Sequence, residues 1–351
     1  MTNFVRTGFM ASAMLIGVTW IVAQHALAQQ PPGQPGAQAG RGQVAPIQPG
    51  VCPTQVGGRG ASLGAGTAGP PRKRVLAWAD SRNGRAQHEY VSYALAQMQR
   101  IGHDSKAYDM IIRTDSDIIS FNPTMTDGKT PASGGPSLCN IDAIVFAGHR
   151  NVPLDTQQRK DLIAAIHDKG IGFVSLFIGM LPNDDFPEMN KILGETPASV
   201  DVHDPFPVTP IINENPNSPF TKNLPKVWNL PGASGYQPDF YSRDDIDVVL
   251  RKDLSKTSPV SKYTRTDGDY PIAWTKMYGK GKVFVSSIGN DENLWDNKDL
   301  LGMYDVAIKW SLGMVNYDVK PHPLPAGVKG PSGPPAPPSA GRAGRGPAPA
   351  Q

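Results

Sequence analysis

The sequence predicts an α/β fold: an open, mostly parallel β-sheet with helices on both faces. Between residues 72 and 319, short apolar runs alternate with stretches of helical periodicity, which is the pattern of strands joined by crossover helices. The run Gly172–Ile178 is apolar without interruption apart from Ser175, as in a strand covered on both faces. The 37 Gly and 35 Pro are too many for one compact domain of 351 residues, so the folded domain is placed within residues 72–319.

Residues 1–28 have the three regions of a secretory signal peptide. Arg6 supplies the positive start, Met10–Val22 is an apolar stretch of thirteen residues, and Ala26-Leu27-Ala28 fits a small-residue cleavage site. The alternative is a membrane anchor, but a spanning helix needs about 20 apolar residues. We expect cleavage near Gln29, a periplasmic or secreted protein, and no stable membrane span after cleavage.

We predict disordered arms over residues 29–71 and 320–351, with a functional tail as the alternative. Both are dominated by small residues and proline, so neither buries enough apolar surface to offset its ordering entropy.

The basic residues of the chain are unevenly distributed. Residues 1–71 and 330–351 hold five arginines and no acidic residue. Taking these from the 34 basic residues leaves 29 against 31 acidic ones, so the core has no basic excess and no nucleic-acid partner is expected.

The first half of the domain predicts alternating strands and helices. The first helix has apolar positions at helical spacing up to Ile101, and Gly102 suits the cap that follows. Asp155 can cap the second helix, which Lys169-Gly170 closes. The predicted strands cover residues 74–79, 107–113, 141–147 and 172–178, and the helices cover 88–101 and 155–169.

Beyond Gly194 the pattern changes to strand-like pieces over residues 206–212, 246–250, 272–277 and 283–288. Tyr278-Gly279-Lys280-Gly281 predicts a hairpin between the last two, because glycine can take the positive φ that a tight turn needs. A closing helix is predicted over Leu300–Leu312, before Gly313. We find no internal repeat and no second core, so one domain is expected.

Several motifs make this domain resemble the ThuA-like, trehalose-utilisation family over roughly residues 73–313. The most specific is the run from Tyr278 to Phe284 (YGKGKVF), preceded by Trp274. The other motifs are His88 after the first strand, Gly170–Val174, Asp239-Phe240-Tyr241, Pro271–Trp274, and Gly289 after the last strand. The resemblance implies a flavodoxin-like sheet related to class I glutamine amidotransferases, and a role in bacterial carbohydrate catabolism.

The chain departs from the amidotransferase pattern at the nucleophile. Those enzymes hold an activated Cys on the strand-to-helix turn that corresponds to Ser175–Ile178 here. This stretch has no Cys, so no glutaminase activity is expected, and strand alternation predicts that the hydroxyl of Ser175 is buried. Many family members carry His at the positions of Phe177 and Asn290, and an amide does not titrate near neutral pH. The resemblance therefore implies that the family's chemistry is altered or lost.

In an open α/β sheet, ligands bind outside the carboxyl ends of the strands. The loops there carry carboxylates, amides, imidazoles and aromatic rings, a set that suits the hydroxyl groups of a carbohydrate. We predict a sugar pocket at this edge, in which His88, Asp80 and Asp291 are the catalytic candidates. The predicted substrate-binding residues are His149, Arg150, Phe177, Asp239, Tyr241, Asn290 and Glu292.

Structural roles are the alternatives for these residues. His88 could be a first-turn helix residue, and Asp80 could cap or turn the chain. Asp291-Glu292 could form a solvated turn that the following helix dipole stabilises. Trp274, in mid-strand, is expected in the core. The whole protein could accordingly be a sugar-processing enzyme, a catalytically silent carbohydrate-binding protein, or a structural envelope module.

Further pairs of residues have more than one possible role. Asp239 and Tyr241 could contact the substrate, or they could equally form a structural hydrogen bond. No pair of candidate ligands has the spacing of a metal motif, so no metal or cofactor is expected. Cys52 and Cys139 predict a disulfide if the chain is exported, with two unpaired thiols as the alternative.

Overall fold

The structure is a computed structural model. It describes residues 52, 72–82, 88–132, 135–148, 153–180, 186–196, 210–233, 236, 238, 240–253, 268–324 and 326–327. The predicted signal peptide lies outside these residues, as do the predicted arms apart from Cys52, residues 320–324 and residues 326–327. In the part of the chain that is described, every helix is too short or too polar to cross a bilayer.

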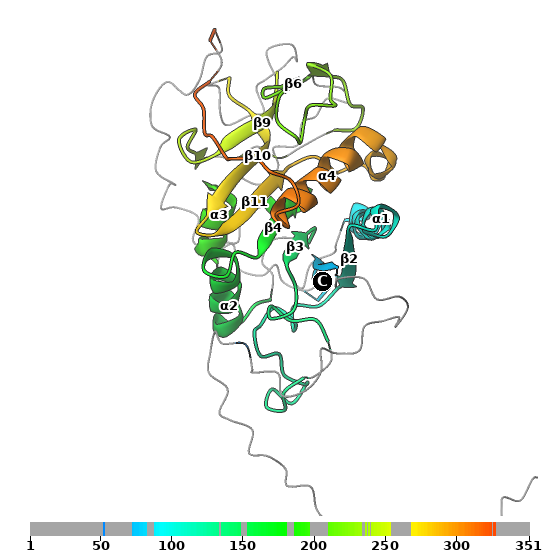
Figure 1. Cartoon of the computed structure of the whole chain (residues 1–351), viewed down its shortest axis with the longest axis vertical. Helices are drawn as coiled ribbons and strands as arrows, with labels where there is room; N and C mark the ends of the chain where they lie inside the picture. The colour runs from blue at the N-terminus through cyan, green and yellow to red at the C-terminus, as the bar shows by residue number, and fades with distance from the viewer. Residues whose placement is uncertain are drawn as a thin grey trace, which may run out of the picture. The chain divides into compact units, whose positions relative to one another are not determined.

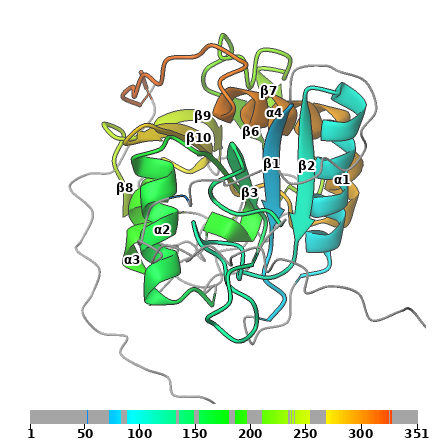
Figure 2. The same cartoon turned by 60° about the horizontal axis from the view of Figure 1, so that its bottom comes forward.

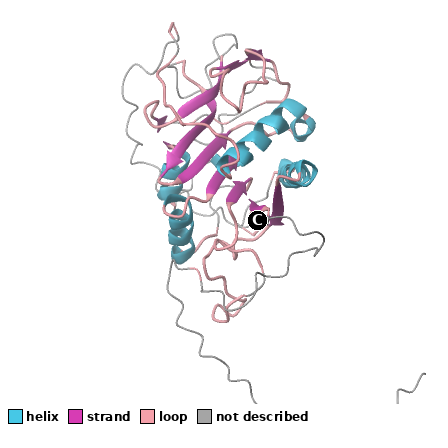
Figure 3. Cartoon of the chain, viewed as in Figure 1, coloured by secondary structure: helices cyan, strands magenta, loops and turns pink. Residues whose placement is uncertain are grey.

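Nine strands of the described chain form one sheet in the order β2-β1-β3-β4-β11-β10-β9-β6-β7 (Figures 1 and 3). The strands are β1 Lys73–Trp78, β2 Tyr108–Arg113, β3 Ala143–Phe146, β4 Gly172–Leu176, β6 Ile211–Asn213, β7 Val227–Trp228, β9 Asp247–Lys252, β10 Pro271–Tyr278 and β11 Gly281–Ser286. A separate antiparallel pair joins β5 Glu195–Thr196 to β8 Phe240–Tyr241.

The predicted parallel half of the sheet is confirmed. β2, β1, β3, β4 and β11 pair in parallel with their neighbours. Every residue of β3 and β4 is buried, as their uninterrupted apolar runs predict for strands covered on both faces. The carboxyl ends of these strands therefore meet at one edge, which we call the carboxyl edge.

The other half differs from the predicted flavodoxin-like, mostly parallel sheet. β10, β9, β6 and β7 all pair antiparallel. β10 and β11 are joined only by Gly279-Lys280, and so short a connection reverses the chain, because a parallel crossover takes a dozen residues or more. The fold is therefore a mixed α/β sheet with one parallel and one antiparallel half.

Helices cover both faces of the sheet, as predicted (Figures 1 and 2). α1 Tyr90–Ser105 and α4 Lys298–Ser311 pack together on one face, while α2 Thr156–His167 and α3 Pro187–Leu193 lie on the other. The predictions for α1, α2 and α4 are confirmed. The short α3 was not predicted, although it begins with proline at its first position and ends at Gly194 in the left-handed region, two ordinary helix-end signals.

The helix ends test the predicted caps. Asp155 caps α2 as predicted, since its carboxylate accepts from the Gln158 N–H at 2.8 Å and the Gln158 side chain accepts from the Asp155 N–H at 3.0 Å. The cap at Gly102 is wrong, because α1 continues to Ser105 and Lys106 takes the left-handed conformation with φ 52°. Gly102 instead permits close packing, since a Cβ there would lie 2.7 Å from the ring of Tyr108.

The predicted hairpin between β10 and β11 is confirmed. Gly279 has φ 58°, and a Cβ at this position would lie 2.4 Å from the carbonyl oxygen of His167. The same oxygen accepts from the N–H of Lys280 at 2.8 Å, which fastens the turn to the end of α2. Trp274 of β10 is fully buried, as expected for the core, and its indole N–H donates to the carbonyl of Leu193 at 2.9 Å.

The predicted disulfide between Cys52 and Cys139 is present, across a sequence separation of 87.

The chain after α4 packs against the sheet at β9. Tyr317 donates its hydroxyl proton to Asp247 at 2.5 Å, and a ring nitrogen of His322 lies 3.0 Å from the carbonyl oxygen of Val248. Residues 320–322, which the sequence assigned to the tail, therefore pack on the domain because β9 supplies partners for them.

Candidate functional site

The turn after β4 is the centre of the carboxyl edge. The predicted strand over 172–178 ends at Leu176, and Phe177–Met180 form a short 3-10 helix instead. Phe177 has φ 43°, a conformation uncommon for a residue other than glycine. Its ring is fully buried, as the apolar run suggests. The prediction is wrong only about the element, because Phe177 begins the 3-10 helix instead of continuing the strand.

Three rings surround Phe177. The rings of Tyr90 and Tyr236 lie 5.0 and 5.1 Å from it between centroids, and His88 lies at 6.4 Å in an edge-on arrangement. His88 is half-buried, whereas both tyrosines are buried. The imidazole is therefore the part of this cluster that reaches toward solvent.

The turn after β11 borders the same residue. Gly289 has φ 144°, and a Cβ there would lie 2.8 Å from Cζ2 of Trp295 and 3.2 Å from Cβ of Phe177. The backbone thus passes between two aromatic side chains, as only glycine permits. Asn290, the next residue, is exposed. The structure therefore places both His88 and Gly289, the residue before Asn290, next to Phe177.

An aromatic stack holds this turn in place. Trp295 lies between Tyr90 and Tyr304, with centroids 6.0 and 5.6 Å away and nearly parallel planes. Its indole N–H donates to the carbonyl of Gly289 at 3.1 Å, and the hydroxyl of Tyr304 donates to the carbonyl of Ile288 at 2.7 Å. Burial raises the pKa of Tyr304, so it stays a hydrogen-bond donor over the whole physiological range.

The loop between β7 and β8 also reaches the carboxyl edge. Tyr236 of this loop is buried against Phe177, and Gly232 lies beside Asp291, since a Cβ on Gly232 would be 2.8 Å from Oδ2 of Asp291. Sequence reasoning missed this loop. Pro231-Gly232 signals a turn, but nothing local tells which edge of the sheet the turn covers.

Asp291 caps the short 3-10 helix Glu292–Asp296. Its Oδ1 accepts from the backbone N–H of Asn293 at 2.9 Å and from the Asn293 amide at 2.8 Å. Glu292 is exposed in the first turn of this helix. These contacts fit the structural alternative, in which a carboxylate satisfies a helix terminus, and they leave Oδ2 of Asp291 facing the Gly232 loop.

Asp80 follows β1 at the carboxyl edge and is fully buried. Its Oδ1 accepts from the N–H of Arg82 at 2.6 Å, while Oδ2 has no hydrogen bond in the described chain and lies 3.7 Å from the Arg82 guanidinium. The guanidinium of Arg82 instead donates two hydrogen bonds to Asp117, at 3.1 and 3.2 Å, and these raise the pKa of the arginine. Asp80 therefore keeps a buried oxygen available to a further donor.

Tyr241 lies in β8, which pairs with β5 outside the nine-stranded sheet. Its hydroxyl donates to the carboxylate of Asp269, which Arg243 also binds, at 2.6 and 2.9 Å. Arg243 extends this buried network to Glu214. These contacts match the structural alternative for Tyr241. His149, Arg150 and Asp239 lie outside the described residues, and their predicted roles stay predictions.

The structure shows which residue occupies the turn where amidotransferases hold their cysteine nucleophile. Phe177, and no cysteine, occupies the turn after β4, while Cys52 and Cys139 are joined to each other before β3, at the amino end of the strands. Ser175 is fully buried within β4, as predicted. Among the described residues, no three His, Cys, Asp or Glu side chains gather as a metal site would require.

The mixed nine-stranded sheet with helices on both faces makes this an α/β protein. The ThuA model, described as trehalose utilisation, matches residues 74–311, and the chain belongs to this family. A ThuA-like protein from Bacteroides uniformis has the same fold, with a TM-score of 0.53 at 18% identity over 71% of this chain and 95% of that one.

Two further structures are more distant. A ThuA-like protein from Parabacteroides merdae has a TM-score of 0.49 at 12% identity, over 75% of this chain and 96% of that one. A cytoplasmic protein from Salmonella typhimurium has a TM-score of 0.43 at 11% identity, over 67% and 98%. The comparison with curated proteins returned no match.

Proposed function

We propose that this ThuA-family protein is exported and binds a carbohydrate at the carboxyl edge of its parallel strands. The observation that carries the proposal is that His88 and the Gly289-Asn290 turn border the same residue, Phe177. The imidazole of His88 is half-buried and Asn290 is exposed, and an imidazole and an amide can each orient sugar hydroxyls, which both donate and accept hydrogen bonds. The family description, trehalose utilisation, supports a sugar as the ligand class.

In the catalytic form of this proposal, His88 transfers a proton, assisted by Asp80 or Asp291. An imidazole suits this role because it titrates near neutral pH. Asp80 supports it, since its buried Oδ2 has no hydrogen bond in the described chain and is available to a donor. Asp291 likewise has one carboxylate oxygen engaged, because its Oδ1 caps the helix that follows, while its Oδ2 faces the Gly232 loop.

A second candidate is a carbohydrate-binding protein without catalysis. Phe177 favours it, because the residue at the positive-φ turn after β4 carries no nucleophile, base or ligand atom. Binding would then depend on His88 and Asn290 while no bond in the sugar is broken. The two candidates share the site and differ in turnover.

Both candidates are tested by thermal shift of the purified protein with trehalose and a panel of other glycosides, followed by an assay for turnover. His88→Ala should abolish the shift or the turnover. The matched control is His103→Ala, which removes an exposed imidazole near the end of the same α1 region. Turnover that needs His88 supports the enzyme. Binding without turnover supports the second candidate, and no sugar-dependent shift in any variant contradicts both.

Export rests on the sequence of residues 1–28 and on the disulfide, which persists in oxidising compartments. The intact mass of protein recovered from the periplasmic or secreted fraction of a bacterial host should correspond to a chain starting near Gln29. Full-length protein confined to the cytoplasm would contradict export without affecting the sugar-binding proposal.

A further inference from the structure

A cleft of about 300 Å³ opens at the amino end of the parallel strands, away from the carboxyl edge. It is bordered by residues that precede or begin β1, β3 and β4, and both cysteines of the disulfide line it. Cys52 and Cys139 are half-buried rather than enclosed. The disulfide is therefore reachable by a small thiol from this side.

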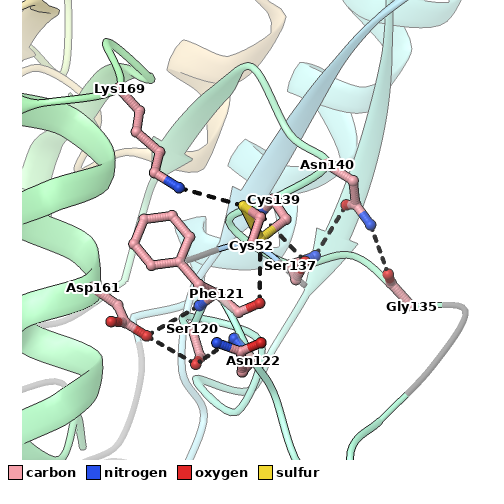
Figure 4. Close-up of a disulfide and its surroundings, with 10 residues drawn as sticks. All are labelled: Cys52, Ser120, Phe121, Asn122, Gly135, Ser137, Cys139, Asn140, Asp161 and Lys169. Atoms are coloured by element: carbon pink, nitrogen blue, oxygen red, sulfur yellow. Dashed lines mark hydrogen bonds between the residues drawn. A yellow bond between two sulfur atoms is a disulfide. The ribbon is translucent and has the colours of Figure 1, made fainter. Parts of the chain in front are cut away.

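The two sulfur atoms have different neighbours (Figure 4). The ammonium group of Lys169 lies 3.4 Å from Sγ of Cys52. The same ammonium group lies 3.8 Å from the centre of the Phe121 ring, a cation–π contact that holds it at this end of the cleft. A positive charge at this distance lowers the pKa of a thiol, because it stabilises the thiolate. After reduction, Cys52 would therefore carry a negative charge readily.

The sulfur of Cys139 lies beside a carbonyl oxygen, which carries a partial negative charge. Its Sγ lies 3.2 Å from the carbonyl oxygen of Phe121. The negative end of a carbonyl dipole opposes a thiolate, but it can accept a hydrogen bond from a thiol. The backbone N–H of Cys139 donates to Ser137 at 3.3 Å, so this part of the chain is held in place independently of the disulfide.

The other charges that line the cleft balance each other. Lys73 binds the carboxylate of Asp142 at 2.8 Å, and the same carboxylate accepts from the N–H of Arg74 at 2.8 Å. Among the described residues, the charged ones that line the cleft are Lys73, Asp142 and Lys169. Of these three, Lys169 is the one that contacts a sulfur atom, that of Cys52.

We propose that the Cys52–Cys139 bond is a thiol–disulfide exchange site with a fixed direction, in which Cys139 is attacked and Cys52 leaves. The co-reactant is a dithiol reductant. Its thiolate forms a bond to Sγ of Cys139, and the electron pair of the broken S–S bond departs with Cys52 as a thiolate beside Lys169. A thiol of low pKa leaves faster than one of high pKa, which sets the direction.

The second thiol of the reductant loses its proton and attacks the mixed disulfide, which releases Cys139. Cys139 takes up one proton and, as a thiol, can donate a hydrogen bond to the carbonyl of Phe121. Cys52 stays ionised, and the other proton goes to solvent. The protein gains two electrons, and the reductant leaves as a disulfide. Reduction breaks the covalent link between residue 52 and the loop before β3, so the site controls whether this part of the chain is tethered there.

The direction is tested on the oxidised, full chain with glutathione, a monothiol whose first attack leaves a mixed disulfide on one cysteine and a free thiol on the other. N-ethylmaleimide added after a short reaction blocks the thiol that has been released, and peptide mass spectrometry locates both groups. We expect glutathione on Cys139 and maleimide on Cys52, in an excess of about five-fold or more over the reverse. Equal amounts, or glutathione mainly on Cys52, would overturn the proposal.

The role of Lys169 is tested by the rate of reduction with dithiothreitol. Lys169→Met should slow reduction about three- to ten-fold, because the departing thiolate loses its counter-charge. Lys73→Met is the matched control: it removes a lysine that lines the same cleft but pairs with Asp142, and it should change the rate by less than about two-fold. An unchanged rate for Lys169→Met, or equal slowing by both variants, would overturn the proposal.

Discussion

The indole of Trp295 donates its N–H to the carbonyl oxygen of Gly289 at 3.1 Å and also fills the space where a side chain on Gly289 would lie. One contact thus fixes the end of β11 at the carboxyl edge and excludes every residue but glycine from this turn. The pair thereby also fixes the backbone that leads into the exposed Asn290.

Gly289→Ala should destabilise the protein by about 2–4 kcal/mol, because a Cβ would lie 2.8 Å from Trp295 and the backbone would keep φ 144°. Urea unfolding measures the change. Gly302→Ala is the control, since Gly302 lies in α4 with no atom near its missing Cβ, and it should stabilise by about 0.5–1 kcal/mol. Equal effects would show that the contact with Trp295 is unimportant.

Arg243→Met should cost about 3–5 kcal/mol. The guanidinium binds Asp269 and Glu214, whose side chains are 0% and 1% exposed, so its removal strips buried carboxylates of a charged partner. Arg100→Met breaks an exposed pair with Asp104 and should change stability by less than about 0.5 kcal/mol. Chemical denaturation compares the two, and a small effect at Arg243 would contradict the importance of the network.

Stability should fall above about pH 10. Burial raises the pKa of Tyr304 in the folded protein, while the unfolded chain has the ordinary value of about 10, so above this pH the unfolded state has released a proton that the folded state retains. The contribution is complete below pH 10 and is lost as pH rises. Tyr304→Phe should reduce the slope by about 1.4 kcal/mol per pH unit there. Denaturation at pH 8–11 measures both slopes, and identical slopes would refute the assignment.

Removal of the disulfide by Cys52→Ala and Cys139→Ala together should lower stability by at most about 4 kcal/mol, because the bond closes a loop across a separation of 87 residues. The double variant and the oxidised wild type are compared by urea unfolding. The reduced wild type is the control, since it lacks the bond and keeps both side chains. A loss in the variant alone would point to packing of the sulfur atoms rather than to loop closure.

Local features of the fold could be predicted from the sequence because they depend on neighbours in the chain. The strand β4 follows from one apolar run, the α2 cap from Asp155 three residues before Gln158, and the hairpin from Gly279. The disulfide could be predicted because the chain has 2 Cys, so only one pairing exists. Periodicity failed at the end of α1, where the packing of Gly102 on Tyr108 overrode a cap signal.

The candidate site was predicted only in part. The residues at the carboxyl ends of strands could be found from strand order alone, and His88 and Gly289, the residue before Asn290, lie beside Phe177. The Tyr236 loop could not be found, because no periodic signal connects it to that edge.

The sequence by itself determined the α/β class, the parallel run of strands and the turn between β10 and β11, since these follow from short-range periodicity and backbone preference. Only the tertiary structure decided that the second half of the sheet is antiparallel and that Tyr90, Trp295 and Tyr236 enclose the turn after β4. It also decided that Lys169 meets one sulfur of the disulfide and a carbonyl meets the other. The physical reason is that these contacts join segments far apart in the chain, and their energies depend on distances that no local pattern records.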